Sequence, residues 1–369
     1  MATATRAGTP LLSTLPGRYY HDPAIYEQER ERIFERMWVC AGRAERAPRP
    51  GDYFAADLGR ESVLVVRGRD GALRAFLNVC RHRGARLCAE GRGHLKGALR
   101  CRYHGWTYGL DGRLLAAPNL GEAEGFDRGE FGLWPVALAV WEGLVWLSLA
   151  DEPEPLAAGI GRALVERFGD EATFARYHVG ELKVARTIEY DVRANWKLLV
   201  ENFLECYHCG PLHPELCRLL PGFRGGLAYQ VGQGTEFADG VEAFTFSGSS
   251  NRPPLPHLQP EDRRRYQGVV LRPNVFVNLL PDHVVLHTLR PQAPDRTRVT
   301  CDWLFDAEVM ARSDFDPQDA VEVFDLVNRQ DWEVCELAQL GTGSRAYRDG
   351  GVYVPIEHHI RRFIDGLKV

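Results

Sequence analysis

Two cysteine–histidine pairs in the first third of the chain have side chains that could hold a metal ion or an iron–sulfur cluster. Cys80 and His82 are separated by one residue, and Cys101 and His104 by two. Two thiolates and two imidazoles form a soft set of four ligands, which suits zinc or an iron–sulfur cluster. For either pair alone, a buried cysteine beside a surface histidine is the alternative. For both pairs together the alternative is a zinc knuckle, although zinc fingers usually have C-x₂₋₄-C followed by H-x₃₋₅-H.

A second group of candidate ligands lies in the segment NWKLLVENFLECYHCGPLHPEL. The pattern predicts a helix over 195–209, and at about 100° per residue Glu201, Glu205 and His208 fall on its polar side. A Gly-Pro pair then ends the helix, so His213 must reach back from the following turn. Two histidines on either side of such a break can converge on one metal ion. For this helix alone, a solvated polar face is the alternative.

A single carboxylate in a third segment has no obvious partner. The pattern predicts a helix over 317–340, which begins at an Asp-Pro pair and places Asp331 near the middle of its apolar stripe. An unpaired buried carboxylate is costly, so Asp331 needs a metal ion, a cation or several donors, and a salt bridge in the core is the alternative. Two neutral histidines, such as His208 and His213, and one carboxylate form the facial triad of non-haem Fe(II) oxygenases.

The elements that must position these groups divide the chain into a β-rich part and a mixed part. Residues 24–40 have apolar side chains at helical spacing and predict an N-terminal helix. From residue 52 to about 149, short apolar runs between Gly and Asp turns predict a small antiparallel β-domain. This domain contains both cysteine–histidine pairs in its loops. The acidic, proline-containing stretch 151–155 is the predicted domain boundary.

Beyond this boundary the pattern predicts a mixed α+β region. Apolar runs at 269–280, 282–291 and 297–306 predict successive strands between the two predicted helices. We therefore predict an α+β protein. Its predicted parts are an N-terminal helical segment (1–40) that packs on the larger domain, the β-domain (41–150) and the larger domain (151–369).

The composition of the chain excludes several classes of protein. It has 369 residues, of which 45% are hydrophobic and 26% charged, so collagen-like, coiled-coil and disordered proteins are excluded. A net charge of -5 gives no overall attraction to nucleic acid or to an anionic membrane. The most apolar stretch, 138–150, is too short to span a bilayer, and we expect a soluble, cytoplasmic protein. The nine cysteines, several of them beside histidines, favour metal binding over disulfides.

The segment between positions 80 and 104 is strongly basic. It contains seven Lys or Arg residues and one acidic residue, Glu90. A solvated basic loop is one interpretation. The other is a surface that docks an acidic electron donor, because complementary charges steer association.

Four stretches of the sequence resemble the large (α) subunit of Rieske non-haem iron oxygenases. They are CRHRGARL, CRYHGWTYGLDGRL, NWKLLVENFLECYHCGPLHPEL and NRQDWEVCELAQLGTGSRAY. The resemblance implies a Rieske [2Fe–2S] cluster in which Cys80 and Cys101 hold one iron and His82 and His104 hold the other. It further implies that a separate Fe(II) ion is bound by His208, His213 and Asp331.

The same resemblance implies a fold, partners and a route for electrons. The fold would be an N-terminal Rieske β-sandwich followed by a helix-grip (START-like) catalytic domain with an antiparallel sheet. A flavin- or ferredoxin-type reductase would supply electrons, O₂ would be the oxidant, and three chains would form a head-to-tail homotrimer. Within it, electrons would cross from the cluster of one subunit to the mononuclear iron of the next through an acidic residue, and Glu205 stands at that position.

The motif ECYHC and the segment LPDHVVLHTLRPQAPDRTRV resemble the branch that acts on quaternary ammonium compounds such as glycine betaine, choline and carnitine. This resemblance implies N-demethylation or hydroxylation of a small substrate of this kind. The alternatives are hydroxylation of an aromatic ring and, less favoured, an electron carrier with a vestigial iron site.

The predicted substrate pocket contains aromatic side chains, whose faces attract a permanent cation. The alternative is that most of them belong to the plain core. The pocket is predicted to consist of Phe203, Phe276, Asn278, His283 and Trp303, with Tyr207 and Phe305 as further candidates.

Overall fold

The computed structural model forms two compact units, one of residues 30–159 and one that combines 1–29 with 160–369. The domain boundaries given above remain predictions. In the part of the chain that the structure describes, no helix is long and apolar enough to cross a membrane. The described residues are 10–88, 91–120, 125–226, 232 and 234–367.

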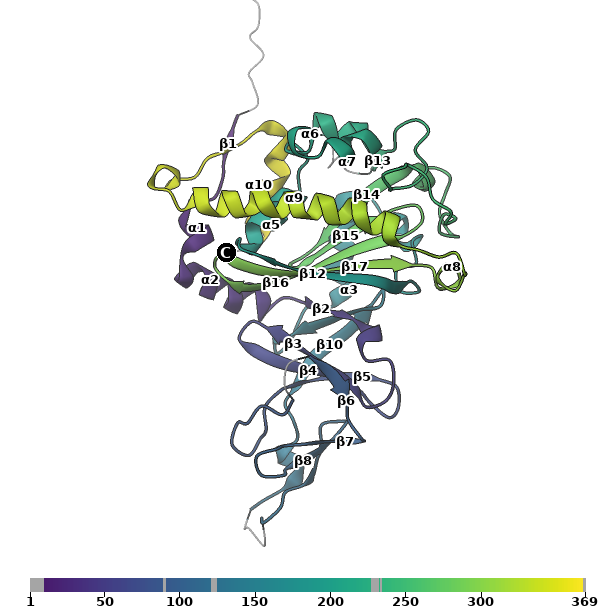
Figure 1. Cartoon of the computed structure of the whole chain (residues 1–369). Helices are drawn as coiled ribbons and strands as arrows, with labels where there is room; N and C mark the ends of the chain where they lie inside the picture. The colour runs from purple at the N-terminus through teal and green to yellow at the C-terminus, as the bar shows by residue number, and fades with distance from the viewer. Residues whose placement is uncertain (1–9, 89–90, 121–124, 227–231, 233, 368–369) are drawn as a thin grey trace, which may run out of the picture. The chain divides into compact units, whose positions relative to one another are not determined.

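The unit of residues 30–159 is built from two antiparallel sheets (Figure 1). Its strands are β2 (Val39–Arg43), β3 (Asp52–Leu58), β4 (Glu61–Arg67), β5 (Leu73–Leu77), β6 (Arg92–His94), β7 (Ala98–Arg100), β8 (Thr107–Gly109), β9 (Leu114–Ala116), β10 (Pro135–Trp141) and β11 (Leu144–Ser148). The larger sheet has the order β2-β11-β10-β5-β4-β3-β6, and the smaller one β7-β8-β9. The predicted antiparallel β-domain is therefore present, with β-branched residues filling the buried middle of β4.

The N-terminal helix is shorter than predicted. The prediction placed one helix over 24–40, but α2 covers Pro23–Glu29, a π-helical turn η1 covers Arg30–Phe34, and β2 already begins at Val39. The apolar run near residue 39 fits a buried strand as well as a helix, because a short apolar run does not distinguish the two.

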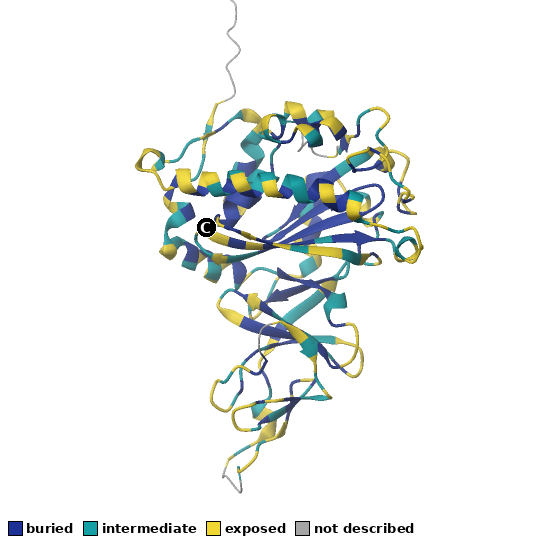
Figure 2. Ribbon diagram, in the orientation of Figure 1, coloured by how far each residue is buried: buried dark blue, intermediate teal, exposed yellow. Residues whose placement is uncertain are grey.

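The other unit is organised around one antiparallel sheet. Its strands are β12 (Lys183–Val192), β13 (Thr235–Glu236), β14 (Arg265–Leu271), β15 (Val275–Leu279), β16 (Val284–Ala293) and β17 (Arg296–Phe305), in the order β12-β17-β16-β15-β14-β13. Figure 2 shows that the middle of this sheet is buried. The single run predicted at 269–280 forms two strands, because Pro273 cannot donate a ladder hydrogen bond and lies in the turn between them.

Two helices carry the candidate ligands. Helix α9 (Gln318–Thr342) lies across the sheet in Figure 1 and agrees with the prediction to within two residues. Helix α5 (Trp196–Phe203) ends six residues before the predicted end at 209. The Glu205 carboxylate accepts hydrogen bonds from the backbone N–H groups of Tyr207 and His208, which stabilise a turn there in place of further helix.

The chain then continues in short helices that surround the ligands. These and the remaining α-helices and β-strands of this unit are β1 (Leu12–Ser13), α1 (Arg18–His21), α3 (Leu156–Phe168, whose first four residues belong to the other unit), α4 (Ala172–Ala175), α6 (Cys209–Leu212), α7 (Pro214–Leu219), α8 (Ala307–Met310), β18 (Val352–Tyr353) and α10 (His358–Gly366).

A buried ion pair joins α2 to the start of α5. Lys197 Nζ lies 2.5 Å from Glu29 Oε1, and the two side chains are 1% and 0% exposed. The second carboxylate oxygen of Glu29 accepts a hydrogen bond from Trp196 Nε1 at 2.9 Å. Burial lowers the pKa of Lys197, although the adjacent carboxylate opposes this effect.

Replacing Lys197 with methionine leaves the Glu29 charge buried without its partner. We expect the free energy of unfolding to fall by about 3–5 kcal/mol, as for other broken buried pairs. Chemical denaturation measures this change, with the exposed Lys183→Met on β12 as the control, expected to shift it by less than about 0.5 kcal/mol. Equal stabilities of the two variants would contradict the prediction.

Candidate active site

Two loops with the same hydrogen bonds carry the cysteine–histidine pairs. In each loop the cysteine N–H donates to the carbonyl of the residue five positions later, at 2.8 Å. A glycine four positions after the cysteine donates back to the cysteine carbonyl, at 3.0 Å. These glycines, Gly84 and Gly105, have φ values of 70° and 75°, which a residue with a side chain adopts only at a cost.

The four side chains of these loops differ in burial. Cys80 and Cys101 are buried and free, whereas His82 and His104 are exposed. The two imidazole rings have centroids 4.6 Å apart, and His82 stacks on the buried Trp106 at 5.0 Å. The loops therefore hold two thiols on the inside and two imidazoles at the surface.

This donor set fits a [2Fe–2S] cluster with one iron held by sulfur inside and the other by nitrogen at the surface. The Tyr108 hydroxyl accepts a hydrogen bond from the backbone N–H of Arg81 at 3.0 Å and can donate to Cys80 Sγ at 3.3 Å. A donor to a cluster thiolate stabilises its negative charge, so Tyr108 is a residue that would tune the reduction potential of the cluster.

Two basic residues of the first loop lie in different surroundings. Arg81 is structural, because its guanidinium donates to the carbonyl of Gly132 at 2.6 Å and lies 3.9 Å from the ring centroid of Trp134. Arg83 is exposed and lies over the exposed ring of Tyr103 at 5.5 Å. Part of the basic surface thus flanks the two histidines, while Glu90 lies outside the described residues.

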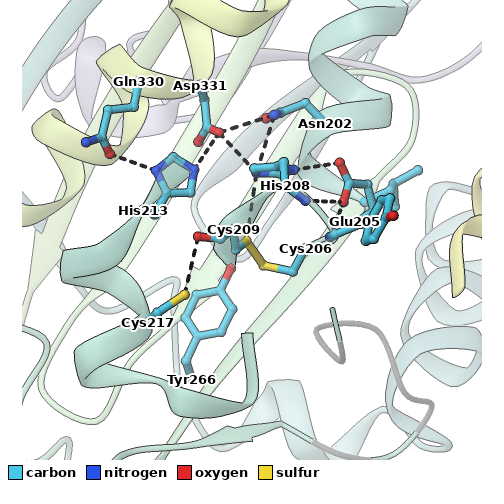
Figure 3. Close-up of a disulfide and its surroundings, with 12 residues drawn as sticks. Asn202, Glu205, Cys206, His208, Cys209, His213, Cys217, Tyr266, Gln330 and Asp331 are labelled. Atoms are coloured by element: carbon cyan, nitrogen blue, oxygen red, sulfur yellow. Dashed lines mark hydrogen bonds and ion pairs between the residues drawn. A yellow bond between two sulfur atoms is a disulfide. The ribbon is translucent and has the colours of Figure 1, made fainter. Parts of the chain in front are cut away.

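In the other unit, His208, His213 and Asp331 converge on one point (Figure 3). The Nε2 atoms of His208 and His213 lie 3.3 and 2.9 Å from Asp331 Oδ1. Among the described residues, these three form the one group of His, Cys, Asp or Glu side chains whose donor atoms could share a metal ion. They come from the turn after α5, the junction of α6 and α7, and the middle of α9.

The outer nitrogens of both histidines have hydrogen-bond acceptors. His208 Nδ1 lies 2.6 Å from Glu205 Oε1, and His213 Nδ1 lies 2.7 Å from Gln330 Oε1. Because carboxylate and amide oxygens only accept, each Nδ1 carries a proton, and each Nε2 is the nitrogen left to bind a metal ion. This is the usual arrangement of metal-binding histidines, whose outer N–H is fixed by a neighbouring oxygen.

The charges at this point favour a bound cation. Burial raises the pKa of Asp331, but hydrogen bonds from the two histidines outweigh it and lower the value to about 2. Burial likewise lowers the pKa of His208, but Asp331 and Glu205 on either side outweigh it and raise the value to about 10. The two carboxylates thus hold a proton on His208, and a divalent ion would replace it.

The donor set fits Fe(II). Two imidazoles and one carboxylate on one side of an ion leave positions open on the other side, as in the facial triad of non-haem iron enzymes. Those positions would face a cavity of about 80 Å³. Bound there, Fe(II) supplies the ability to activate O₂ next to a substrate.

Glu205 and Glu201, which the predicted helix placed on the same face, lie in different surroundings. Glu205 contacts the outer nitrogen of His208, so the imidazole ring separates its carboxylate from the metal position. Glu201 accepts hydrogen bonds from the Tyr20 hydroxyl at 2.9 and 3.1 Å. The projection failed for this pair because α5 ends at Phe203, so the helical spacing does not extend to Glu205.

Aromatic and amide side chains form the walls of the cavity. Besides the candidate ligands and Glu205, it is lined by Phe203, Phe223, Phe244, Tyr266, Phe276, Phe324, Trp332, Asn202, Asn278, His287, Asn328, Cys206, Cys209, Leu216, Gly268 and Val327. Phe203 and Phe276 stack with their centroids 4.2 Å apart.

Three of the predicted pocket residues, Phe203, Phe276 and Asn278, line this cavity, and His283 and Trp303 do not. His283 lies in the turn between β15 and β16, where its Nδ1 is 2.7 Å from Asp282 Oδ1. Trp303 is fully buried in the core on β17. Strand position alone does not show which residues of a strand reach the cavity.

Tyr207 and Phe305, the further candidates, also lie away from the cavity; Tyr207 is 58% exposed and Phe305 is buried against His283. Sequence reasoning missed several lining residues on α9. Phe324, Val327 and Asn328 share the helix face of Asp331, so helical spacing from the ligand could have identified them.

Cys206 and Cys209 form a disulfide beside His208, with their Cα atoms 4.9 Å apart (Figure 3). The sequence analysis favoured metal binding over disulfides for cysteines beside histidines, and for this pair it was wrong. Cys206 and Cys209 are three residues apart at the turn after α5, and this spacing places their Cα atoms within the range of a disulfide. The other seven cysteines, all within the described residues, form no disulfide.

Two family models match the chain and define its class. The Rieske [2Fe-2S] domain matches residues 37–130, and the ring hydroxylating alpha subunit (catalytic domain) matches residues 179–367. The chain therefore belongs to the Rieske non-haem iron oxygenases, as a catalytic α subunit. Its cofactors are a [2Fe–2S] cluster and Fe(II), and the zinc alternative is wrong. Oxygenases of this family use O₂, a small-molecule substrate and electrons from a reductase.

Relatives along nearly the whole chain are oxygenase subunits of monooxygenases. The glycine betaine monooxygenase oxygenase subunit of Chromohalobacter salexigens is 33% identical, over 95% of this chain and 84% of the relative. The carnitine monooxygenase oxygenase subunit of Escherichia coli K12 is 30% identical, over 92% and 86%. The crystal structure of the quaternary ammonium Rieske monooxygenase CntA with gamma-butyrobetaine has a TM-score of 0.73 and 26% identity, over 96% and 94%. The predicted fold class and branch are confirmed.

Proposed function

We propose that the protein oxidises a C–H bond of a small quaternary ammonium compound. The observation that carries the proposal is the aromatic-walled cavity next to His208, His213 and Asp331. The relatives named above act on glycine betaine and carnitine, both of which carry a trimethylammonium group. The substrate, O₂, two electrons and two protons would give a hydroxylated product and water, and a hydroxylated N-methyl group would leave as formaldehyde.

The walls of the cavity suit a permanent cation. The stacked rings of Phe203 and Phe276, together with Tyr266, Phe324 and Trp332, provide aromatic faces. Each such face attracts a cation by roughly 0.5–2 kcal/mol, with the larger values in desolvated sites. A neutral aromatic substrate would gain no such charge attraction.

The roles of the site residues follow from their contacts. His208, His213 and Asp331 would hold Fe(II), and Cys80, Cys101, His82 and His104 would hold the cluster. Gln330 would fix the ring of His213 through its Nδ1. Asn202 Nδ2 donates to Asp331 Oδ1 at 3.2 Å and would hold the carboxylate group in its present orientation.

Glu205 would connect the iron site to an electron donor. Its carboxylate lies on the outer side of the His208 ring, opposite the metal position, and its side chain is 14% exposed. In a head-to-tail homotrimer, a histidine of the neighbouring subunit's cluster would bond to the same carboxylate. Electrons would then pass from imidazole to imidazole through hydrogen bonds to Glu205.

Product analysis tests the proposed function. With a working flavin- or ferredoxin-type reductase and NADH, we expect substrate-dependent O₂ uptake and an oxidised product from at least one of choline, glycine betaine and carnitine. Benzoate is the control and should leave O₂ uptake at its background rate. Product from benzoate, with none from the three ammonium compounds, would favour the aromatic alternative.

A further inference from the structure

One wall of the cavity is a chain of hydrogen bonds between uncharged groups. The Tyr266 hydroxyl donates to Asn278 Oδ1 at 2.7 Å, Asn278 Nδ2 donates to His287 Nδ1 at 3.2 Å, and His287 Nε2 donates to Asn328 Oδ1 at 2.9 Å. Burial lowers the pKa of His287 to about 4, so the imidazole is neutral at pH 7 and has one acceptor and one donor nitrogen.

The same chain continues through the core to a carboxylate. Asn328 Nδ2 donates to the Tyr190 hydroxyl at 3.3 Å, and this hydroxyl donates to Asp325 Oδ1 at 2.6 Å. The second amide hydrogen of Asn278 goes to the carbonyl of Val285 at 3.2 Å. Each group in this chain thus donates to the next one, starting from Tyr266. The hydrogens of the Asn278 amide and the His287 imidazole are therefore already used within the wall.

One residue that lines the cavity carries a donor without a partner in the described chain. Trp332 lines the cavity and is 8% exposed, and within the described chain its indole Nε1 is buried with no hydrogen-bond partner. A buried N–H without a partner is destabilising, and an oxygen atom of a bound substrate would satisfy it. A single neutral N–H suits a hydroxyl oxygen better than a carboxylate, which needs several donors or a cation.

The charges around the cavity also disfavour an anion. Its two carboxylates, Glu205 and Asp331, would be balanced by Fe(II), which leaves no net positive charge for a substrate carboxylate. Arg167 approaches the outside of the wall, where its Nε donates to the carbonyl of Gly268 at 2.7 Å. Its side chain, however, lines a separate cavity.

We propose that this cavity takes quaternary ammonium alcohols, such as choline, in preference to ammonium carboxylates, with Trp332 Nε1 donating to the substrate hydroxyl. The aromatic walls bind the trimethylammonium group, and the neutral polar wall accepts a hydroxyl without having to pair a negative charge. The inference rests on the proposed function and narrows its substrate class.

Calorimetric titration of the oxidised, iron-loaded protein tests this preference without turnover. The probes are choline, glycine betaine and n-propyltrimethylammonium, which replaces the choline hydroxyl with a methyl group. We expect choline to bind at least about tenfold more tightly than glycine betaine. We expect it to bind about three- to tenfold more tightly than the propyl analogue, the worth of one hydrogen bond.

Each other outcome overturns a definite part of the account. Glycine betaine binding as tightly as choline, or more tightly, contradicts the inference and leaves the proposed function intact. Failure of all three compounds to bind contradicts both. Equal binding of choline and the propyl analogue contradicts the hydrogen bond to the hydroxyl.

Variants at two lining residues of α9 sharpen the test. Trp332→Phe should remove the advantage of choline over the propyl analogue while both still bind, with metal content checked in the same sample. Val327→Lys should add a cation to the cavity and bring the affinity for glycine betaine to that of choline or above it, whereas Val327→Met, of similar length, should not. An unchanged preference in Val327→Lys would contradict the electrostatic part of the inference.

Discussion

Replacement of Asp331 by alanine is expected to remove the mononuclear iron and abolish turnover while the [2Fe–2S] cluster remains. Within the described residues, the carboxylate is the one anionic group that both histidine Nε2 atoms approach, at 2.9 and 3.3 Å. Without it, His208 and His213 provide two neutral ligands, and a hard Fe(II) ion loses the ligand that balances its charge. The cluster lies in the other unit and its four candidate ligands do not include Asp331.

Metal and sulfide analysis of the same sample measures this result. The wild-type protein should contain three iron atoms and two acid-labile sulfides per chain, and the variant two irons and two sulfides, as the composition of a [2Fe–2S] cluster requires. Glu333→Ala, an exposed position of the same helix, is the control and should keep all three irons. An Asp331→Ala protein that retains its third iron and its activity would show that another carboxylate binds the metal.

Replacement of Glu205 by glutamine is expected to leave both metal centres intact and slow turnover by at least about 10- to 100-fold. The side chain contacts the outer Nδ1 of His208 at 2.6 Å but is not one of the three converging ligands. Glutamine is nearly the same size and retains one oxygen acceptor. It removes the charge that would hold two imidazoles of neighbouring subunits in line.

Stopped-flow spectroscopy separates this role from a purely structural one. Oxidation of the reduced cluster after mixing with O₂ and substrate should slow by the same factor as turnover, while iron content and the cluster spectrum stay normal. Glu201→Gln, on the preceding helix and bonded to Tyr20, is the matched control and should keep the wild-type rate. Rapid cluster oxidation in Glu205→Gln would contradict the proposed electron route.

The candidate ligands could be predicted because short local rules place them. Gly84 and Gly105 follow the two cysteine–histidine pairs and close two loops that have the same hydrogen bonds. The residue spacing therefore predicts that the cysteine and the histidine of each pair lie in one loop. Asp331 was identified because a carboxylate within an apolar helix stripe must have a partner. These rules depend on neighbours in the chain and not on the tertiary fold.

The cavity could be predicted only in part, because tertiary packing determines it. Phe276 and Trp303 are both aromatic strand residues, but the first lines the cavity and the second is enclosed in the core. The early end of α5 depends on the Glu205 carboxylate bonding to the backbone after it, which no periodicity reveals. That turn also contains Cys206, whose disulfide with Cys209 was not predicted.

The wall of the cavity illustrates the same limit. Tyr266, His287 and Asn328 come from β14, β16 and α9 and are joined by hydrogen bonds through Asn278 on β15. In the sequence they lie in three separate segments, 265–271, 284–293 and 318–342. Only the register of the strands and the position of α9 show that they form one polar wall.

The central claim is that electrons, O₂ and a quaternary ammonium compound meet at His208, His213 and Asp331. Mass spectrometry after a single turnover tests it most directly: the protein is reduced without air, mixed with choline, glycine betaine or carnitine, and then exposed to O₂. We predict a hydroxylated or demethylated product from at least one of the three, in an amount comparable to the mononuclear iron, and none from Asp331→Ala. The contrary result is oxidation of the cluster with no change in any of the three compounds.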